Sequence, residues 1–158
     1  LVVYLQNERG LQAALSNNYL ALFFGLIMLG RLIGGFIVKR LGYLRTTLIA
    51  SLLGIVSISI GIFTPYSFFL PITGFFFSII FPTLTAAVSD VEHENINTIL
   101  GVLFTFSGLG GVVGPWLVAW GSELFGLQIG FTILIPLTAL TSIFIFILGK
   151  RSQHGKSS

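Results

Sequence analysis

Long apolar stretches separated by short polar ones dominate the sequence. Each holds about twenty residues, and at about 1.5 Å per residue such a helix covers roughly 30 Å, the thickness of the hydrocarbon core of a bilayer. The pattern predicts five complete membrane spans. We therefore expect an all-α fold, a polytopic transmembrane helical bundle whose spans lie at about residues 19–38, 46–63, 68–88, 98–120 and 128–148.

The two ends of the chain lie outside these spans. Residues 1–5 are apolar, too short to cross a bilayer, and not preceded by a charged leader. We expect them to end a helix whose beginning is missing, which makes the chain a fragment of a longer protein. Residues 1–148 are expected to form one bundle, and the basic residues 149–158 a disordered tail.

Polar residues beside the spans predict where helices begin and end. The run Ser16-Asn17-Asn18 contains good helix N-caps and is expected to start the first complete span. Gly121-Ser122-Glu123 is expected to begin the turn before the last span. His93 lies between Glu92 and Glu94 in a polar loop, which we interpret as solvated rather than metal-binding.

The composition supports a membrane protein. Only 8% of the residues are charged and 54% are hydrophobic, whereas soluble domains contain about 25% charged residues. The chain therefore lacks the polar residues to cover itself in water, and its surroundings are expected to be a lipid bilayer. The absence of cysteine excludes disulfides and thiolate metal sites. The net charge of +3 comes from loops beside spans, so we expect no nucleic-acid partner.

The basic residues predict the orientation in the membrane. One side of the bilayer receives all of them except Arg31, within a span, and Arg9, on the opposite side. Short loops rich in Lys and Arg stay on the cytoplasmic side. The expected protein is thus a multi-pass protein of the cell membrane with a cytoplasmic C-terminus, and its cytoplasmic side carries Lys39, Arg40, Arg45, Lys150, Arg151 and Lys156.

Enzyme motifs are absent from the sequence. It contains no phosphate-binding loop, no His-Glu-x-x-His and no Gly-x-Ser-x-Gly, and no paired acids lie within the spans. We therefore expect no catalytic residues, no cofactor and no metal. Arg31 is the one charge inside a span, and such a charge marks function or extends to the nearer interface. We interpret it as part of a cytoplasmic gate.

A few polar residues near the middle of the spans are candidates for a substrate cavity. Thr73 and Ser78 lie in the third span with Phe77, and Thr105 and Ser107 lie in the fourth. Hydroxyl groups beside aromatic rings suit an uncharged polyhydroxy solute. Ordinary hydrogen bonds between helices are the alternative interpretation.

The fourth span is rich in glycine. Gly110-x-x-x-Gly114 places two glycines on one helix face, which allows close packing against a neighbour. Pro115 follows, so this helix is either a packing surface or a bent, moving element of a gate. Gly114→Leu is then expected to abolish folding or transport. Pro82 predicts a kink in the third span.

The turn between the first two spans resembles a known family motif. Gly-x-Leu-Ala-Asp-Arg-x-Gly-Arg-Lys is the hallmark cytoplasmic loop of the major facilitator superfamily, and Gly35-Phe36-Ile37-Val38-Lys39-Arg40-Leu41-Gly42 is similar to it. Lys39 stands where the family has Asp, which puts that residue's latching role in doubt. The expected gating-loop residues are Gly30, Arg31, Gly35, Lys39, Arg40, Gly42 and Arg45.

The resemblance implies the C-terminal six-helix half of a twelve-helix secondary transporter, whose N-terminal half is missing here. Phe81-Pro82-Thr83 resembles the fucose-permease-like branch, so a sugar or similar small organic solute is the expected substrate. No Asp or Glu lies in mid-span, and a proton symporter would need its carboxylate in the missing half. The alternative is a helical membrane scaffold or partner subunit that transports nothing.

Overall fold

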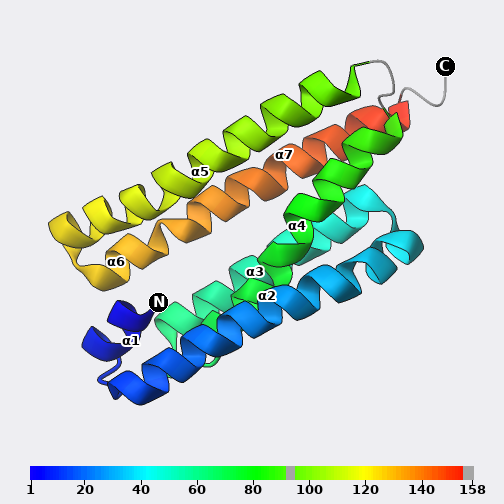
Figure 1. Cartoon of the computed structure of the whole chain (residues 1–158). Coiled ribbons are helices and arrows are strands. Elements are labelled where there is room, and N and C mark those ends of the chain that lie inside the picture. Colours follow the sequence, from blue (N-terminus) through cyan, green and yellow to red (C-terminus); the bar gives the residue numbers. More distant parts are fainter. Residues whose placement is uncertain (92–94, 155–158) are drawn as a thin grey trace.

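The apolar stretches form long helices, as the sequence predicts (Figure 1). The computed structural model describes residues 1–91 and 95–154. Within them, five segments are long and apolar enough to cross a membrane, which confirms the all-α transmembrane fold class. The helices are α1 (Val2–Asn7), α2 (Ala13–Leu41), α3 (Tyr43–Phe63), α4 (Phe69–Val91), α5 (Ile96–Phe125), α6 (Leu127–Thr132) and α7 (Leu134–His154).

The first long helix begins earlier than predicted. Gln12, whose backbone is extended, caps α2, and Ser16 lies inside the helix with its N–H donating to the Gln12 carbonyl at 3.0 Å. The expectation that Ser16, Asn17 and Asn18 cap this helix is therefore wrong. A polar side chain does not mark the start of a helix when the backbone hydrogen bonds of the helix already include its residue. At Ser16 they do.

Two predicted ends of helices also differ from the structure. Residues 121–123 belong to α5, and the turn comes at Gly126, whose positive φ of 92° suits glycine. Gly121 is buried because α5 and α6 approach closely there, so a turn at 121–123 is wrong. The last span is interrupted at Ile133, which separates α6 from α7.

The C-terminal residues were expected to form a disordered tail. Instead α7 continues through residues 149–154 and ends at His154, which contradicts that prediction for this part. Residues 155–158 of the tail lie outside the described residues. The same is true of Glu92, His93 and Glu94, for which we predict a solvated loop.

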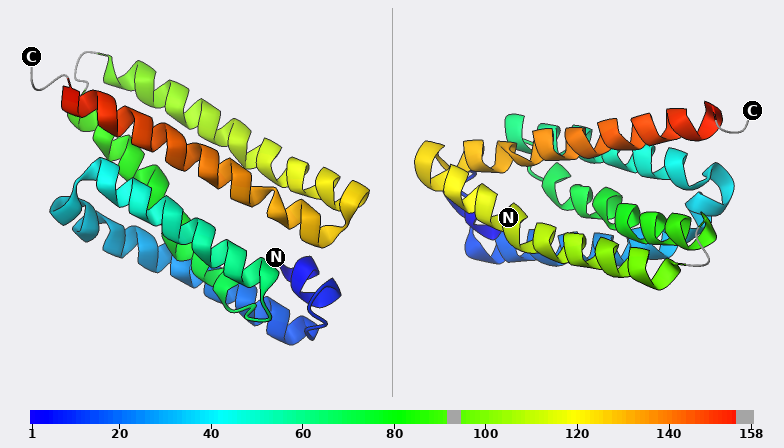
Figure 2. Two further views of the ribbon diagram at one scale, coloured as in Figure 1. Left: turned by 180° about the vertical axis from the view of Figure 1, so that it is seen from behind. Right: turned by 90° about the horizontal axis from the view of Figure 1, so that it is seen from above.

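The packed part of the bundle is built around α3 and α4. α4 packs along both α2 and α3, and α7 packs against α3 (Figures 1 and 2). Two hydroxyl groups join these helices: Ser57 donates to the Phe69 carbonyl of α4 at 2.8 Å, and Ser142 of α7 donates to Ser51 of α3 at 2.9 Å. Such bonds stabilise helix contacts where no water competes.

One end of the bundle carries the Gly42 turn, the end of α4, the start of α5 and the end of α7 (Figure 1). We call it the basic end, because Lys39, Arg40 and Arg45 lie around the Gly42 turn. The opposite end holds α1 and an apolar cluster that joins it to α3 and α4. The buried members of that cluster are Tyr4, Leu5, Ile58, Ile62 and Leu70.

α5 is set apart from this packed core. It contacts α6 and, to a smaller extent, α4, where the rings of Phe104 and Phe81 meet edge to face with centroids 5.5 Å apart. None of the described residues in its most apolar stretch is buried, whereas half of those in α3 are. The most apolar stretch of α5 is thus left uncovered by the other described residues of this chain.

Candidate functional site

The basic turn joins α2 and α3 through a single residue, Gly42. Its φ of 79° and ψ of 164° belong to a region that glycine alone adopts readily. The Gly42 N–H donates to the Val38 carbonyl at 2.8 Å, and its carbonyl accepts from the Thr46 N–H at 3.1 Å. Lys39 and Arg40 lie in the last turn of α2, where the helix dipole favours positive charge.

A side-chain contact ties this turn to α4. The Tyr43 hydroxyl, at the first residue of α3, donates a hydrogen bond to the Asp90 carboxylate near the end of α4. Asp90 lies in the last turn of α4, which extends beyond residue 88, the predicted end of the third span. This hydrogen bond joins α3 to α4 at the basic end. Asp90 is the one acidic residue described at that end.

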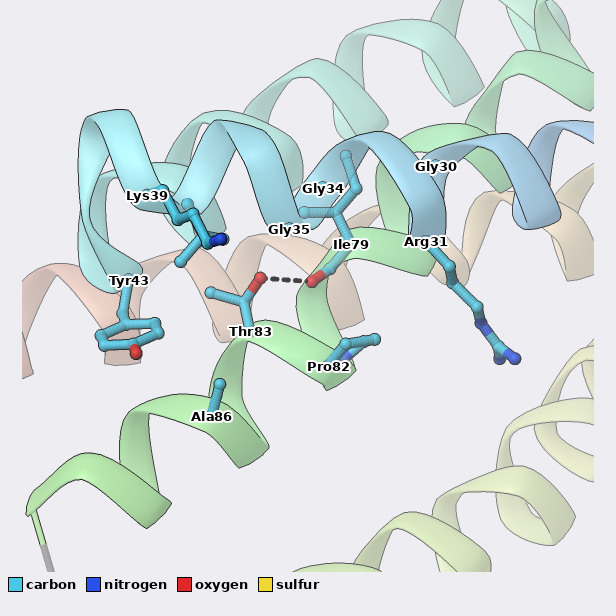
Figure 3. A pocket seen from close by; sticks show the side chains of 11 residues that line it. Gly30, Arg31, Gly34, Gly35, Lys39, Tyr43, Ile79, Pro82, Thr83 and Ala86 are labelled. Carbon is cyan, nitrogen blue, oxygen red and sulfur yellow. Dashed lines mark hydrogen bonds between the residues drawn. The ribbon is translucent and has the colours of Figure 1, made fainter.

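Beside the turn, α2 and α4 enclose a cleft of about 240 Å³ (Figure 3). Its lining includes Gly30, Gly34 and Gly35 on α2, and Thr83 and Ala86 on α4. The buried Ile79 forms part of its wall. The full lining is Gly30, Arg31, Gly34, Gly35, Val38, Lys39, Tyr43, Ile79, Pro82, Thr83 and Ala86.

Two cations line the cleft, Arg31 and Lys39, and both are exposed. The Arg31 side chain extends away from Lys39 and the Gly42 turn, so it does not reach toward the basic end (Figure 3). Arg40 and Arg45, predicted to belong to the same gating loop, are exposed and lie outside the cleft lining. The predicted gating-loop residues therefore fall into two groups. The residues that line the cleft are Gly30, Arg31, Gly35 and Lys39, and those exposed outside it include Arg40 and Arg45.

The candidate substrate residues lie in different surroundings in this chain. Thr73 and Ser78 are buried and donate to carbonyls of their own helix, Leu70 at 2.6 Å and Phe75 at 2.8 Å respectively. Both hydrogen bonds lie within α4, whereas the alternative interpretation expects hydrogen bonds between helices.

The other three candidates lie elsewhere. The Phe77 ring fills the space beside Gly54 of α3. Thr105 and Ser107 lie exposed on α5, and Thr105 donates to the Gly101 carbonyl at 2.8 Å. The structure therefore separates the α4 residues, turned into the core, from the α5 residues on the open face.

The predicted glycine face of α5 is unpacked within the described chain. A Cβ atom added at Gly110 or Gly114 would meet no atom within 4 Å, and Pro115 beside them is exposed. The described residues supply no partner for this face, so the packing groove stays a prediction. α4 continues as a helix through Pro82, which also lines the cleft, and the kink expected there stays a prediction.

Close packing occurs instead at a spacing that our sequence reasoning missed. Gly30-x-x-x-Gly34 has the same pattern, and α4 lies directly against it. A Cβ at Gly30 would fall 2.5 Å from the Phe75 carbonyl oxygen, and one at Gly34 would fall 3.1 Å from Ile79. The spacing is visible in the sequence, where Gly30 belongs to the predicted gating loop and Gly34 has no predicted role.

The long apolar helices and the basic one-residue turn define a polytopic helical membrane protein. Compared with protein families, the whole chain, residues 1–158, matches the Major Facilitator Superfamily. The chain belongs to this superfamily of transporters. Comparison with curated proteins and with solved structures gave no match.

Proposed function

We propose that the chain is the C-terminal half of a secondary active transporter that moves a small organic solute, a sugar or similar compound, by alternating access. The observation that carries the proposal is the basic turn at Gly42 with the cleft behind it. A one-residue link between two long helices transmits movement of one helix directly to the other. A missing N-terminal half of the same transporter would cover the open face of α5, and the solute would pass between the halves.

The α5 face supports a hydroxyl-bearing solute. Thr105 and Ser107 are both exposed on α5, on opposite sides of the helix, and each is next in the sequence to an exposed ring, that of Phe104 or Phe106. Aromatic faces beside hydroxyl groups suit the apolar and polar sides of a sugar ring. Proton symport would require a carboxylate in the missing half, because the acids described here, Glu8, Asp90 and Glu123, all lie near helix ends.

The main test separates a transporter from a scaffold. The chain has no cysteine, so Ser107→Cys in a cysteine-free full-length protein places one thiol on the open face of α5. We expect a membrane-impermeant maleimide to label it in both right-side-out and inside-out vesicles, because alternating access exposes the site to each side in turn. A scaffold that keeps this face against lipid or a partner gives no labelling from either side, and that result would reject the proposal.

Gly42→Val tests the turn itself. A β-branched residue at this positive φ costs about 1–3 kcal/mol of backbone strain, which the helix junction must relieve by moving. We expect uptake of radiolabelled glucose or fucose by cells making the full-length protein to fall about tenfold or more, since each 1.4 kcal/mol is a factor of ten. Membrane insertion, measured by the amount of protein in the membrane fraction, should stay unchanged. Wild-type uptake in the variant would remove the turn from the mechanism.

A further inference from the structure

The last membrane-spanning segment is interrupted between α6 and α7. Ile133 keeps helical dihedral angles, φ −57° and ψ −27°, but the backbone hydrogen bonds around it are long. Its N–H donates to the Gly130 carbonyl at 3.3 Å, and its carbonyl accepts from the Leu137 N–H at 3.4 Å, beyond the usual range of about 2.7–3.2 Å. Pro136 has no N–H, so the carbonyl four residues earlier lacks its usual helical donor. Residues 133–136, which we call the hinge segment, therefore bend more easily than the helices on either side.

α5 and α6 form one rigid hairpin. A single residue, Gly126 with a φ of 92°, joins the two helices. A Cβ added at Gly130 would lie 2.6 Å from the Val118 carbonyl oxygen, and one added at Gly121 would lie 3.4 Å from the Gly130 Cα. Because the two backbones touch at these glycines, bending at the hinge segment moves α5 and α6 together.

Apolar contacts hold the hairpin to the rest of the bundle. Phe131 of α6 lies against Tyr4 of α1 with ring centroids 4.7 Å apart, and Leu127 packs on the same buried cluster. Among the described residues, no hydrogen bond joins α6 to α1 or to α3. The Thr132 hydroxyl donates to the Gln128 carbonyl of its own helix at 2.9 Å. Apolar contacts of this kind can separate without leaving a polar group unpaired.

We propose that the α5–α6 hairpin is a hinged lid at the end of the bundle opposite the basic end. It pivots at the hinge segment, and the contact of Phe131 with Tyr4 holds it closed; α1 and the Gly126 turn both lie at this end (Figure 1). Hinges are commonly a few residues at the end of an element. A bend of about 20°, the size of a sharp helix kink, moves the Gly126 turn, about 10 Å away along α6, by about 3 Å or more.

The lid carries the exposed surface of α5 with it. None of the described residues in the most apolar stretch of α5 is buried, so nothing described there opposes the movement. The other end of this helix contacts α4 through the rings of Phe104 and Phe81, so the tip at Gly126 moves farthest. The inference goes beyond the proposed transport and requires no solute, because the movement belongs to the chain itself.

The experiment measures the position of the lid in the purified full-length protein, made cysteine-free and held in phosphatidylcholine nanodiscs. Spin labels on Leu124→Cys at the tip of α5 and Val56→Cys on α3, both exposed positions, report their separation by double electron–electron resonance. We expect a second population whose distance is longer by about 3 Å or more. Phe131→Ala removes the ring that holds the lid and should raise this population about two- to tenfold, the effect of losing one aromatic pair. Pro136→Ala restores an N–H donor and should remove the longer distance, both alone and combined with Phe131→Ala.

Each variant has a matched control. Pro115→Ala removes a proline from α5, outside the hinge segment, and Phe144→Ala removes an exposed ring from α7. Both should leave the distribution of distances unchanged. If Phe131→Ala does not fold, Phe131→Leu, which keeps an apolar contact but not the ring, should raise the longer-distance population to a smaller extent.

The outcomes decide whether the hairpin is a lid. A longer distance that increases when Phe131 is replaced and disappears with Pro136→Ala supports the hinge. One distance in every variant, equal changes in variants and controls, or a longer distance that Pro136→Ala leaves in place overturns it. A rigid hairpin would leave the labelling test at Ser107 standing, whereas failure of that labelling would reject alternating access and leave these distances unaffected.

Discussion

Arg9 folds back over the end of α3 and completes its last turn. Its guanidinium donates to the carbonyls of Gly61 at 2.9 Å and Ile62 at 2.6 Å, and it lies 5.8 Å from the centre of the Tyr4 ring. The last carbonyls of a helix have no partner within it and carry the negative end of its dipole. A partly buried cation at this position therefore holds the α1 connection against α3.

Arg9→Gln should lower the free energy of unfolding by about 1.5–3 kcal/mol, the usual contribution of hydrogen bonds to a charged group. Unfolding of the purified protein in detergent, followed by circular dichroism, measures this change. Glu8→Gln is the control, because Glu8 is exposed and adjacent, and it should change stability by less than about 0.5 kcal/mol. Equal small effects of both variants would show that the carbonyl contacts do not stabilise the fold.

At the scale of elements, two helices carry the same glycine spacing in opposite surroundings. Gly30 and Gly34 of α2 lie against α4, while Gly110 and Gly114 of α5 face open space within this chain. The pattern removes side chains from one face, and this permits a close approach without requiring one. Whether a helix packs closely at such a glycine pair depends on whether a neighbouring helix lies against it.

Gly30→Leu should therefore disrupt the bundle, because its side chain would collide with Ser78 and the Phe75 carbonyl. Overpacking of this kind costs about 1–3 kcal/mol, and more where backbone is hit. Gly114→Leu in the same chain should fold normally, which revises the expectation from the sequence alone. Size-exclusion chromatography and thermal unfolding in detergent show whether each of the two variants folds. A stable Gly30→Leu protein would contradict the close α2–α4 contact.

The whole molecule has two chemically different ends. Lys39, Arg40 and Arg45 lie beside the Gly42 turn at the basic end, and Arg9 contacts the far end of α3. The end of α7 also lies at the basic end (Figure 1). Because short basic segments remain in the cytoplasm, the proposed orientation places the basic end inside the cell.

A reporter experiment tests this orientation. Green fluorescent protein fused after Ser158 should fluoresce, and alkaline phosphatase at the same position should be inactive, because the phosphatase folds only outside the cytoplasm. Phosphatase inserted in the segment between α1 and α2 should be active, because this segment is expected outside the cell. Swapped activities would place the basic end outside, and with it the cleft.

The number and kind of helices follow from the sequence, because they depend on neighbouring residues. An apolar stretch of about twenty residues must satisfy its backbone internally in lipid, and a helix does so. The turn that resembles the hallmark loop, residues 35–42, is equally local, and the comparison with families confirms the superfamily over residues 1–158. Helix ends were less predictable, as Ser16 and Gly121 show, because a helix continues wherever packing supports it.

The tertiary structure determined which residues distant in the sequence contact one another. The Tyr43–Asp90 contact, the cleft between α2 and α4, and the contacts of Arg9 with α3 each join separate helices. The direction of Arg31 and the burial of Thr73 and Ser78 also depend on which helix lies opposite. Composition and periodicity determined that this chain spans a membrane as helices, whereas the packing of those helices determined which of its polar residues remain open to a ligand.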